Sequence, residues 1–218
     1  MKNQGAQKGG NIILTACVLF NLSIGVLYAW SVMKARLSAP IAEGGWGWTS
    51  TQAGLPYTIA IIVFATAMLI GGKIQDKIGP RWVVTAGGVF AGAGIMLSGL
   101  VGNNPVGVAL CFGVIYGIGM GFGYGCVTPP ALKWFHPSKK GLISGLIVGG
   151  FGLSAVYFAP LANALLGRFD IEQTFIFLGA GVLVVGVLLA QLIKNPPAGY
   201  TPQAPRRQRS RCQGRPRS

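Results

Sequence analysis

The 218-residue chain is 51% hydrophobic and only 10% charged, whereas soluble proteins average about 25% charged residues. A mean hydropathy of +0.56 therefore excludes an ordinary soluble protein. The net charge of +14 could serve phosphate contacts in a nucleic-acid complex, but the basic residues fall between long charge-free stretches. We expect a lipid bilayer as the environment and no nucleic-acid partner.

Five stretches lack charge, and about 20 apolar residues suffice to cross a bilayer. The longest, residues 82–132, divides at the turn-forming sequence Gly102-Asn103-Asn104-Pro105. We therefore predict an all-α membrane protein with six transmembrane helices, near residues 11–33, 52–72, 82–101, 106–128, 141–166 and 172–193. Because the connections are short, helices adjacent in sequence should pack side by side.

The basic residues predict the topology, because cytoplasmic loops are enriched in Lys and Arg. With the N-terminus inside, three basic residues face outward: Lys34, Arg36 and Arg168. Nine face inward, before the six Arg of the tail: Lys2, Lys8, Lys73, Lys77, Arg81, Lys133, Lys139, Lys140 and Lys194. We expect an integral plasma-membrane protein, of the bacterial inner-membrane kind, with both termini cytoplasmic.

Three regions follow from this pattern. Residues 1–10 form a cytoplasmic N-terminus, residues 11–194 the six-helix transmembrane domain, and residues 195–218 a Pro- and Arg-rich tail. The composition of the tail is typical of a disordered segment. Its abrupt change of character near Gln203 favours a truncated or frame-changed end.

Glycine recurs every four residues in two of the predicted helices, where such stripes let helix backbones approach closely. The fourth helix carries Gly113, Gly117, Gly121 and Gly125, and the fifth carries Gly141, Gly145 and Gly149. We predict that these two helices pack through their stripes. Close glycine contacts would also allow the two helices to rock against each other.

A loop motif lies between the second and third predicted helices. It consists of Gly72, Asp76, Gly79 and Arg81. Gly72 and Gly79 permit a tight turn, and Asp76 has cations around it, with Lys133 at the inner end of the fourth helix as a further candidate partner. We interpret the group as a gate loop; the alternative is a solvated carboxylate.

This motif resembles the loop signature of the major facilitator superfamily. The segments 25–31, 117–125, 133–141 and 149–153 are similar to the oxalate/formate antiporter family, with monocarboxylate transporters as the nearest competitor. The resemblance implies the N-terminal half of a twelve-helix carrier, with small organic anions as substrates and a second six-helix half, another chain or a second copy, as partner. The resemblance implies that Asp76 acts in a gate and is not simply a solvated carboxylate.

The resemblance also implies a substrate site. Aromatic residues of the first, fourth and fifth helices box the substrate in oxalate carriers, and the matching positions here are Tyr28, Tyr124 and Phe151. A family Gln is Leu27 here and a family Tyr is Phe151, which favours a less polar monocarboxylate over oxalate. Apart from Glu172 at the first position of the sixth, the predicted spans hold no Lys, Arg, His, Asp or Glu, so the cation that a buried anion needs is expected from the second half.

Other functions have less support. His136 is the only histidine, and the four carboxylates lie in loops or, for Glu172, at the first position of a span. The sequence therefore shows no candidate nucleophile and base pair, and we predict no enzyme, no cofactor and no metal site. A non-transporting scaffold or a vestigial fragment stays open as the alternative. So do other small molecules as substrates of a major facilitator carrier.

Overall fold

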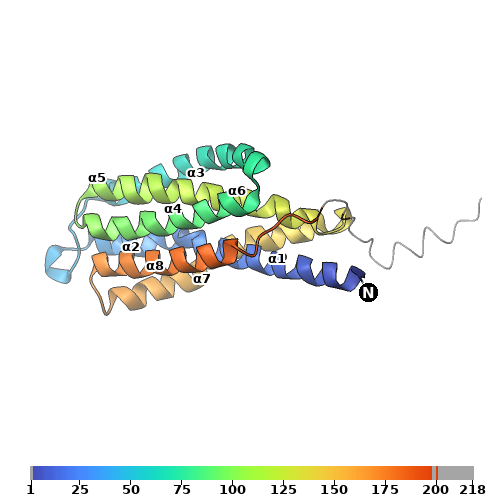
Figure 1. Ribbon diagram of the computed structural model, residues 1–218. Helices are drawn as coiled ribbons and strands as arrows, with labels where there is room; N and C mark the ends of the chain where they lie inside the picture. The colour runs from blue at the N-terminus through green and yellow to red at the C-terminus, as the bar shows by residue number, and fades with distance from the viewer. Residues whose placement is uncertain (1, 198–199, 201–218) are drawn as a thin grey trace, which may run out of the picture.

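The computed structural model describes residues 2–197 and 200, and in that part of the chain all regular structure is helical. Six helical segments are long and apolar enough to cross a membrane, as predicted (Figure 1). We number them spans 1 to 6 in chain order. Their bounds are Gly9–Ser38, Ser50–Ile78, Pro80–Val101, Pro105–Lys133, Pro137–Leu166 and Ile171–Ala190.

Span 1 is interrupted and longer than predicted. It comprises α1 (Lys2–Ile24), the 3-10 turn η1 (Gly25–Ala29) and α2 (Trp30–Ser38). The helix therefore begins at Lys2 rather than near residue 11 and continues past residue 33. Lys34 and Arg36, predicted in an outer loop, are helical residues of α2.

Local sequence sets the ends of spans 2 and 3. Span 2 is α3 (Ser50–Ile78), whose N-terminus has a capping box between Thr49 and Gln52, a pairing that satisfies free backbone N–H groups. Gly79 then turns the chain with φ +89°, and Pro80 starts α4 (Pro80–Val101), which is span 3. A single glycine thus makes the turn, and Gly72, predicted to help make it, lies inside α3.

Span 4 consists of α5 (Pro105–Val108), the π-helix η3 (Ala109–Tyr116) and α6 (Gly117–Lys133). The Asn104 side chain accepts hydrogen bonds from the N–H groups of Val106 and Gly107 at its start. The short 3-10 turn η2 (Ile41–Glu43) lies between spans 1 and 2, and a second one, η4 (Pro137–Lys139), begins span 5. α7 (Lys140–Leu166) and α8 (Ile171–Ala190) complete spans 5 and 6.

The helices do not pack in chain order. The most extensive contacts join α4 with α8 and α3 with α6, and α1 packs mainly on α7. In the part of the chain that the structure describes, spans 3 and 4 are the only sequence neighbours that pack closely. The prediction that adjacent helices pack side by side is therefore wrong for most pairs, because a short connection joins helix ends without fixing which faces meet.

The glycine stripe of span 4 lies against α3. A β-carbon at Gly113 or Gly117 would meet Ile59, Ala60 or Val63, and one at Gly121 would lie 2.6 Å from the Ala67 β-carbon. At Gly125 the neighbour is Met68. Backbone-to-backbone contact of this kind replaces the hydrophobic drive that lipid cannot supply.

The predicted pairing of spans 4 and 5 through glycine is wrong. A β-carbon at Gly141, Gly145 or Gly149 would meet nothing within 4 Å in the described part of the chain. The reason is the orientation of α7, whose buried face carries Ile143, Ile147 and Phe151 instead. This buried face packs on α1.

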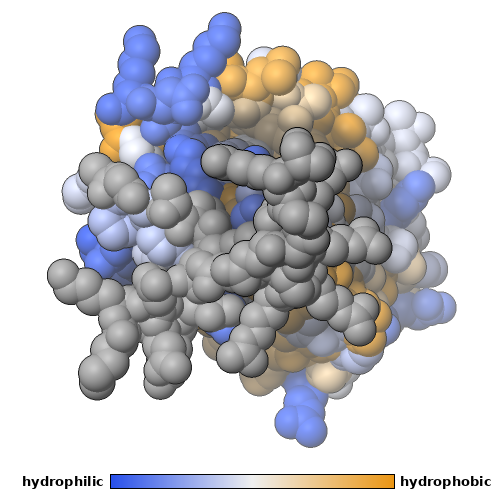
Figure 2. Space-filling view, turned by 90° about the vertical axis from the view of Figure 1, so that its right-hand side faces the viewer, coloured by the Kyte–Doolittle hydropathy of each residue, from blue (hydrophilic) through white to orange (hydrophobic). Residues whose placement is uncertain are grey.

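The bundle has two ends (Figure 1). We call the end with the N-terminus proximal and the end with residues 39–49, 102–104 and 167–170 distal. Figure 2 looks onto the proximal end, where hydrophilic side chains project around the rim and hydrophobic surface covers the flank behind them. This distribution fits a rim in the headgroup layer and flanks in lipid.

The start of the predicted tail is held at the proximal end. The Trp134 indole N–H donates to the carbonyl of Lys194 at 2.9 Å, and the Tyr200 hydroxyl donates to the carbonyl of Trp134 at 3.2 Å. The two rings are 5.3 Å apart. Of the tail predicted to be disordered, residues 195–218, the structure describes only residues 195–197 and 200; residues 198–199 and 201–218 lie outside the described part.

Candidate functional site

The three predicted substrate aromatics lie together, although they come from three different spans. Phe151 of α7 stands between Tyr28 of η1, with ring centroids 5.2 Å apart, and Tyr124 of α6, at 5.0 Å. The Phe64 ring of α3 continues the row at 5.6 Å from Tyr124. Phe151 is 7% exposed and Tyr28 is 48% exposed, so the cluster has a buried base and one open side.

Tyr28 owes its position to the break in span 1. η1 replaces about one turn of α-helix and includes Tyr28, and a 3-10 stretch inside a helix is often a hinge. Gly25 starts this turn against α7, where a β-carbon would collide with the Ser154 side chain. Glycine is required at this crossing because any side chain would push span 1 away from α7.

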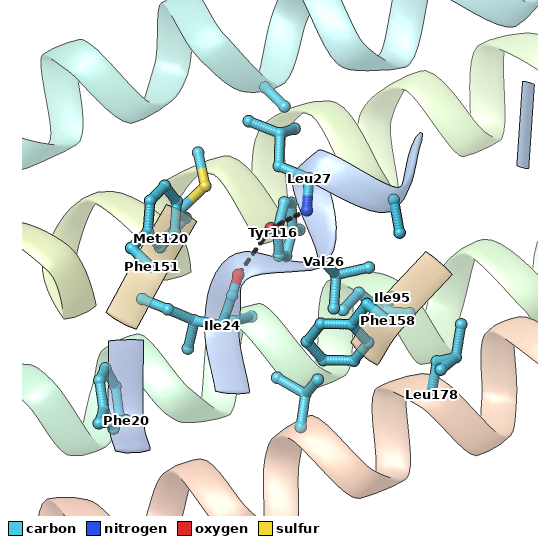
Figure 3. Packing of buried hydrophobic residues seen from close by; sticks show 14 of the residues in the cluster. Phe20, Ile24, Val26, Leu27, Ile95, Tyr116, Met120, Phe151, Phe158 and Leu178 are labelled. Carbon is cyan, nitrogen blue, oxygen red and sulfur yellow. Dashed lines mark hydrogen bonds between the residues drawn. The ribbon is translucent and has the colours of Figure 1, made fainter. Parts of the chain in front are cut away.

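Side-chain hydroxyls satisfy the backbone groups freed by the break. The Tyr116 hydroxyl accepts from the N–H of Leu27 at 2.9 Å and donates to the carbonyl of Ile24 at 2.8 Å (Figure 3). The Ser154 hydroxyl lies 2.9 Å from the carbonyl of Gly25 and 2.6 Å from that of Phe151. In a membrane interior such compensation is necessary, because unpaired backbone groups have no water to bond.

α7 is tied to span 1 by two side-chain hydrogen bonds in the last turns of α1, just before the break. The Tyr157 hydroxyl donates to the carbonyl of Leu22 at 3.0 Å, and the Asn21 amide donates to the carbonyl of Ile147 at 3.0 Å. Phe151 and Tyr28 are therefore carried by two helices that side-chain hydrogen bonds hold in fixed register.

The gate-loop residues lie near the proximal end but do not form the predicted pair. Asp76 and Lys133 are both exposed, and no hydrogen bond or ion pair joins them in the described structure. Arg81 instead donates through Nε to the Gln191 side-chain oxygen at 2.9 Å, after the end of α8. Gln191 in turn donates to the Thr85 hydroxyl at 3.2 Å, so Arg81 ties span 3 to span 6.

Sequence reasoning missed the residues that build the break: Gly25, Tyr116, Ser154 and Tyr157. One signal was present, since Gly25 precedes the candidate Tyr28 by three residues and glycine lowers helix stability. The hydroxyls gave no signal, because Tyr and Ser in a span read equally well as packing residues.

The sequence matches the profile of the Major Facilitator Superfamily over residues 12–216. The MFS-type transporter YhjX of Escherichia coli is 30% identical over 190 residues, and the oxalate:formate antiporter of Oxalobacter formigenes is 29% identical over 184. These alignments cover 85% and 84% of this chain but 44% and 42% of the relatives. Mouse monocarboxylate transporter 1 is 29% identical, with 69% of this chain and 38% of the relative covered.

A crystal structure of the peptide transporter POT in complex with alafosfalin has the same fold. It superposes with a TM-score of 0.66 at 17% identity, over 93% of this chain and 43% of the other. The chain thus spans less than half the length of the relatives that it matches. With its six spans, and with relatives that are transporters, the chain belongs to the Major Facilitator Superfamily.

Proposed function

We propose that this chain is one six-helix half of a secondary carrier for small carboxylates. The observation that carries the proposal is the meeting of Tyr28, Phe151 and Tyr124, with ring centroids 5.0 and 5.2 Å apart, on an open side of the bundle. Aromatic faces can enclose the carbon skeleton of a small acid, while the two phenol hydroxyls donate to its oxygens.

The substrate class is supported by the named relatives, an oxalate:formate antiporter and a monocarboxylate transporter. Within that class we favour a monocarboxylate such as lactate or pyruvate. Leu27 and Phe151 are apolar where oxalate carriers have hydrogen-bonding side chains, and the Leu27 side chain is buried. A second carboxylate on the substrate would therefore find fewer hydrogen-bond donors here than in an oxalate carrier.

The second half is proposed to cover α3 and α7. Of the six spans, these two are the least buried within the bundle: 22% of the apolar stretch of α3 and 33% of that of span 5 are buried. On α7 the open face includes Gly141, Gly145 and Gly149, so another helix could approach its backbone closely. In this proposal the glycine stripe of α7 packs against the second half and not against span 4.

Two further roles belong to the proposal. Asp76, with Gly72, Gly79, Arg81 and Lys133 nearby at the proximal end, would act as the gate that stabilises one carrier state. The excess of Lys and Arg at the proximal end supports an orientation in a bacterial inner membrane with both termini on the cytoplasmic side.

The decisive experiment is uptake of labelled oxalate, formate, lactate and pyruvate into vesicles that hold this chain with a second six-helix half. Saturable uptake that falls in Tyr28→Phe and Tyr124→Phe, but not in Tyr57→Phe on the outside of α3, is the expected result. A non-transporting scaffold is the alternative. If the chain is a scaffold, uptake of all four acids should stay at background with any second half that is tested. This should hold even when both chains are shown to be inserted and associated.

A further inference from the structure

The extension of span 1 gives this half two cations that the sequence assigned to a loop. Lys34 and Arg36 both lie on α2, where residues two positions apart do not share a helix face. The Lys34 amine lies 3.9 Å from where a β-carbon on Gly54 would stand, and so faces α3. Arg36 lines a cavity between α2 and α7.

This cavity has a volume of about 370 Å³ and lies near the distal end. Among the described residues Arg36 is the only charged one in the lining, and Asn163 of α7 adds an amide. Arg36 is partly buried and makes no ion pair with any carboxylate of the described chain. The remaining lining is Val32, Ala35, Ala39, Leu166 and Gly167.

The cavity lies on the same side of the bundle as the aromatic cluster. On span 1 its lining residues follow Tyr28 by 4, 7, 8 and 11 positions, the spacing of a single helix face. On α7, Asn163 and Gly167 continue the exposed face of Gly149 through Gly152, Val156 and Pro160. At a rise of 1.5 Å per residue, Arg36 stands about 12 Å beyond Tyr28 along the helix axis.

We infer that the Arg36 cavity is an anion-binding station, where a small carboxylate from the distal side binds before it reaches the aromatic cluster. The inference rests on the proposed function for the identity of its ligand. A guanidinium can hold a carboxylate through two parallel hydrogen bonds, and the Asn163 amide supplies another donor. The partly buried position weakens the competition from water that an exposed arginine meets.

The station can be tested on the 218-residue chain itself, reconstituted in nanodiscs. Phenylglyoxal modifies free guanidinium groups, and peptide mass spectrometry follows Arg36 and Arg168 separately. Arg168 is the control because it is exposed at the same end but does not line the cavity. Pyruvate at about ten times its Kd should slow modification of Arg36 about tenfold and leave Arg168 unchanged.

Variants identify the site. Asn163→Leu should raise the protecting concentration of pyruvate about tenfold, and Asn163→Gln, which keeps an amide, should restore part of the loss. Equal protection of both arginines, protection by chloride at the same concentration, or no protection overturns the inference. Protection of Arg36 by an added second half without any carboxylate also overturns it, and assigns Arg36 to an ion pair between the halves.

In a completed carrier, Arg36→Gln should raise the KM for substrate on the distal side about tenfold, while Lys34→Gln leaves it unchanged. The KM for substrate on the proximal side should not move in either variant. If the completed wild-type carrier transports nothing, the proposed function is contradicted, but the phenylglyoxal result is not affected. If the carrier is active and Arg36→Gln has no effect on KM, the anion-binding station is contradicted while the proposed function is not.

Discussion

Tyr116 and Leu27, 89 residues apart, are joined by a hydrogen bond of 2.9 Å from the Leu27 N–H to the phenol oxygen. The same hydroxyl donates to the carbonyl of Ile24, so one side chain serves both sides of the turn. Tyr116 is fully buried, and no water is available to take over either bond. The break in span 1 is therefore part of the packed core and is held by span 4.

The first prediction concerns this hydroxyl. Tyr116→Phe removes one oxygen and leaves two buried backbone groups unpaired, at a cost of about 1 to 3 kcal/mol for each group. We expect a lower unfolding temperature in detergent and faster hydrogen exchange at the Leu27 amide. Tyr57→Phe, on the partly exposed side of α3, is the control. Unchanged exchange at Leu27 in Tyr116→Phe contradicts the role.

The two glycine stripes should respond differently to substitution. Gly121→Leu forces a side chain into the α3 backbone, and overpacking typically costs about 1 to 3 kcal/mol. Gly145→Leu should leave the stability of the isolated chain unchanged, because a β-carbon at that position meets no atom within 4 Å in the described part of the chain. Thermal unfolding of both variants measures the difference. If the second half covers α7, Gly145→Leu should weaken its association, and equal binding would place that stripe against lipid.

Much of the fold could be predicted because hydropathy records what the bilayer requires of each span. The helix ends were less accurate, since Lys34 and Arg36 end the charge-free stretch at residue 33 while α2 continues to Ser38. Charged side chains at a helix end can reach the interface, so charge does not mark where the helix stops. The glycine period was read correctly, but which helix each stripe meets depends on the rotation of the helix in the bundle.

The site was predictable in its aromatic members and not in its support. Tyr28, Tyr124 and Phe151 were found through resemblance, and the structure brings them together. The hydroxyl of Tyr116 could not be assigned, because its partners are backbone groups that become free only where the helix breaks. The cavity lined by Arg36 could not be predicted, because the sequence analysis assigned Arg36 to a loop and not to a helix.

Asp76 gives a third prediction. Asp76→Asn in a completed carrier should slow exchange about tenfold, the effect of losing about 1.4 kcal/mol from one carrier state, while insertion stays intact. Asp76 makes no ion pair in the described structure, so its partner is expected in another state or in the second half. Asp170→Asn at the distal end is the matched control. Equal exchange rates in wild type and Asp76→Asn remove this carboxylate from the mechanism.

The orientation of the chain can be measured directly. Single cysteines at Glu43 and Lys139 lie in exposed turns at opposite ends of the bundle, in a background where the four native cysteines are replaced. An impermeant maleimide added outside intact cells should label Glu43→Cys and miss Lys139→Cys, because basic segments stay inside. The reverse pattern contradicts a cytoplasmic N-terminus.

The last prediction is that this chain alone does not transport. The Tyr28 and Tyr124 hydroxyls can each contribute about 1.5 to 3 kcal/mol to binding a charged group, whereas burying an ion costs several kcal/mol. Arg36 cannot make up the difference at the aromatic cluster, since it stands about 12 Å further along the helix.

Purified chain in vesicles should therefore give only background uptake of pyruvate, and addition of a second half with its own cations should restore saturable exchange. Insertion is checked by protease protection, so that an empty result cannot come from misfolding. Saturable uptake by this chain alone contradicts the prediction. It would mean that two copies face each other across α3 and α7, and that each supplies the other with the missing wall of the pathway.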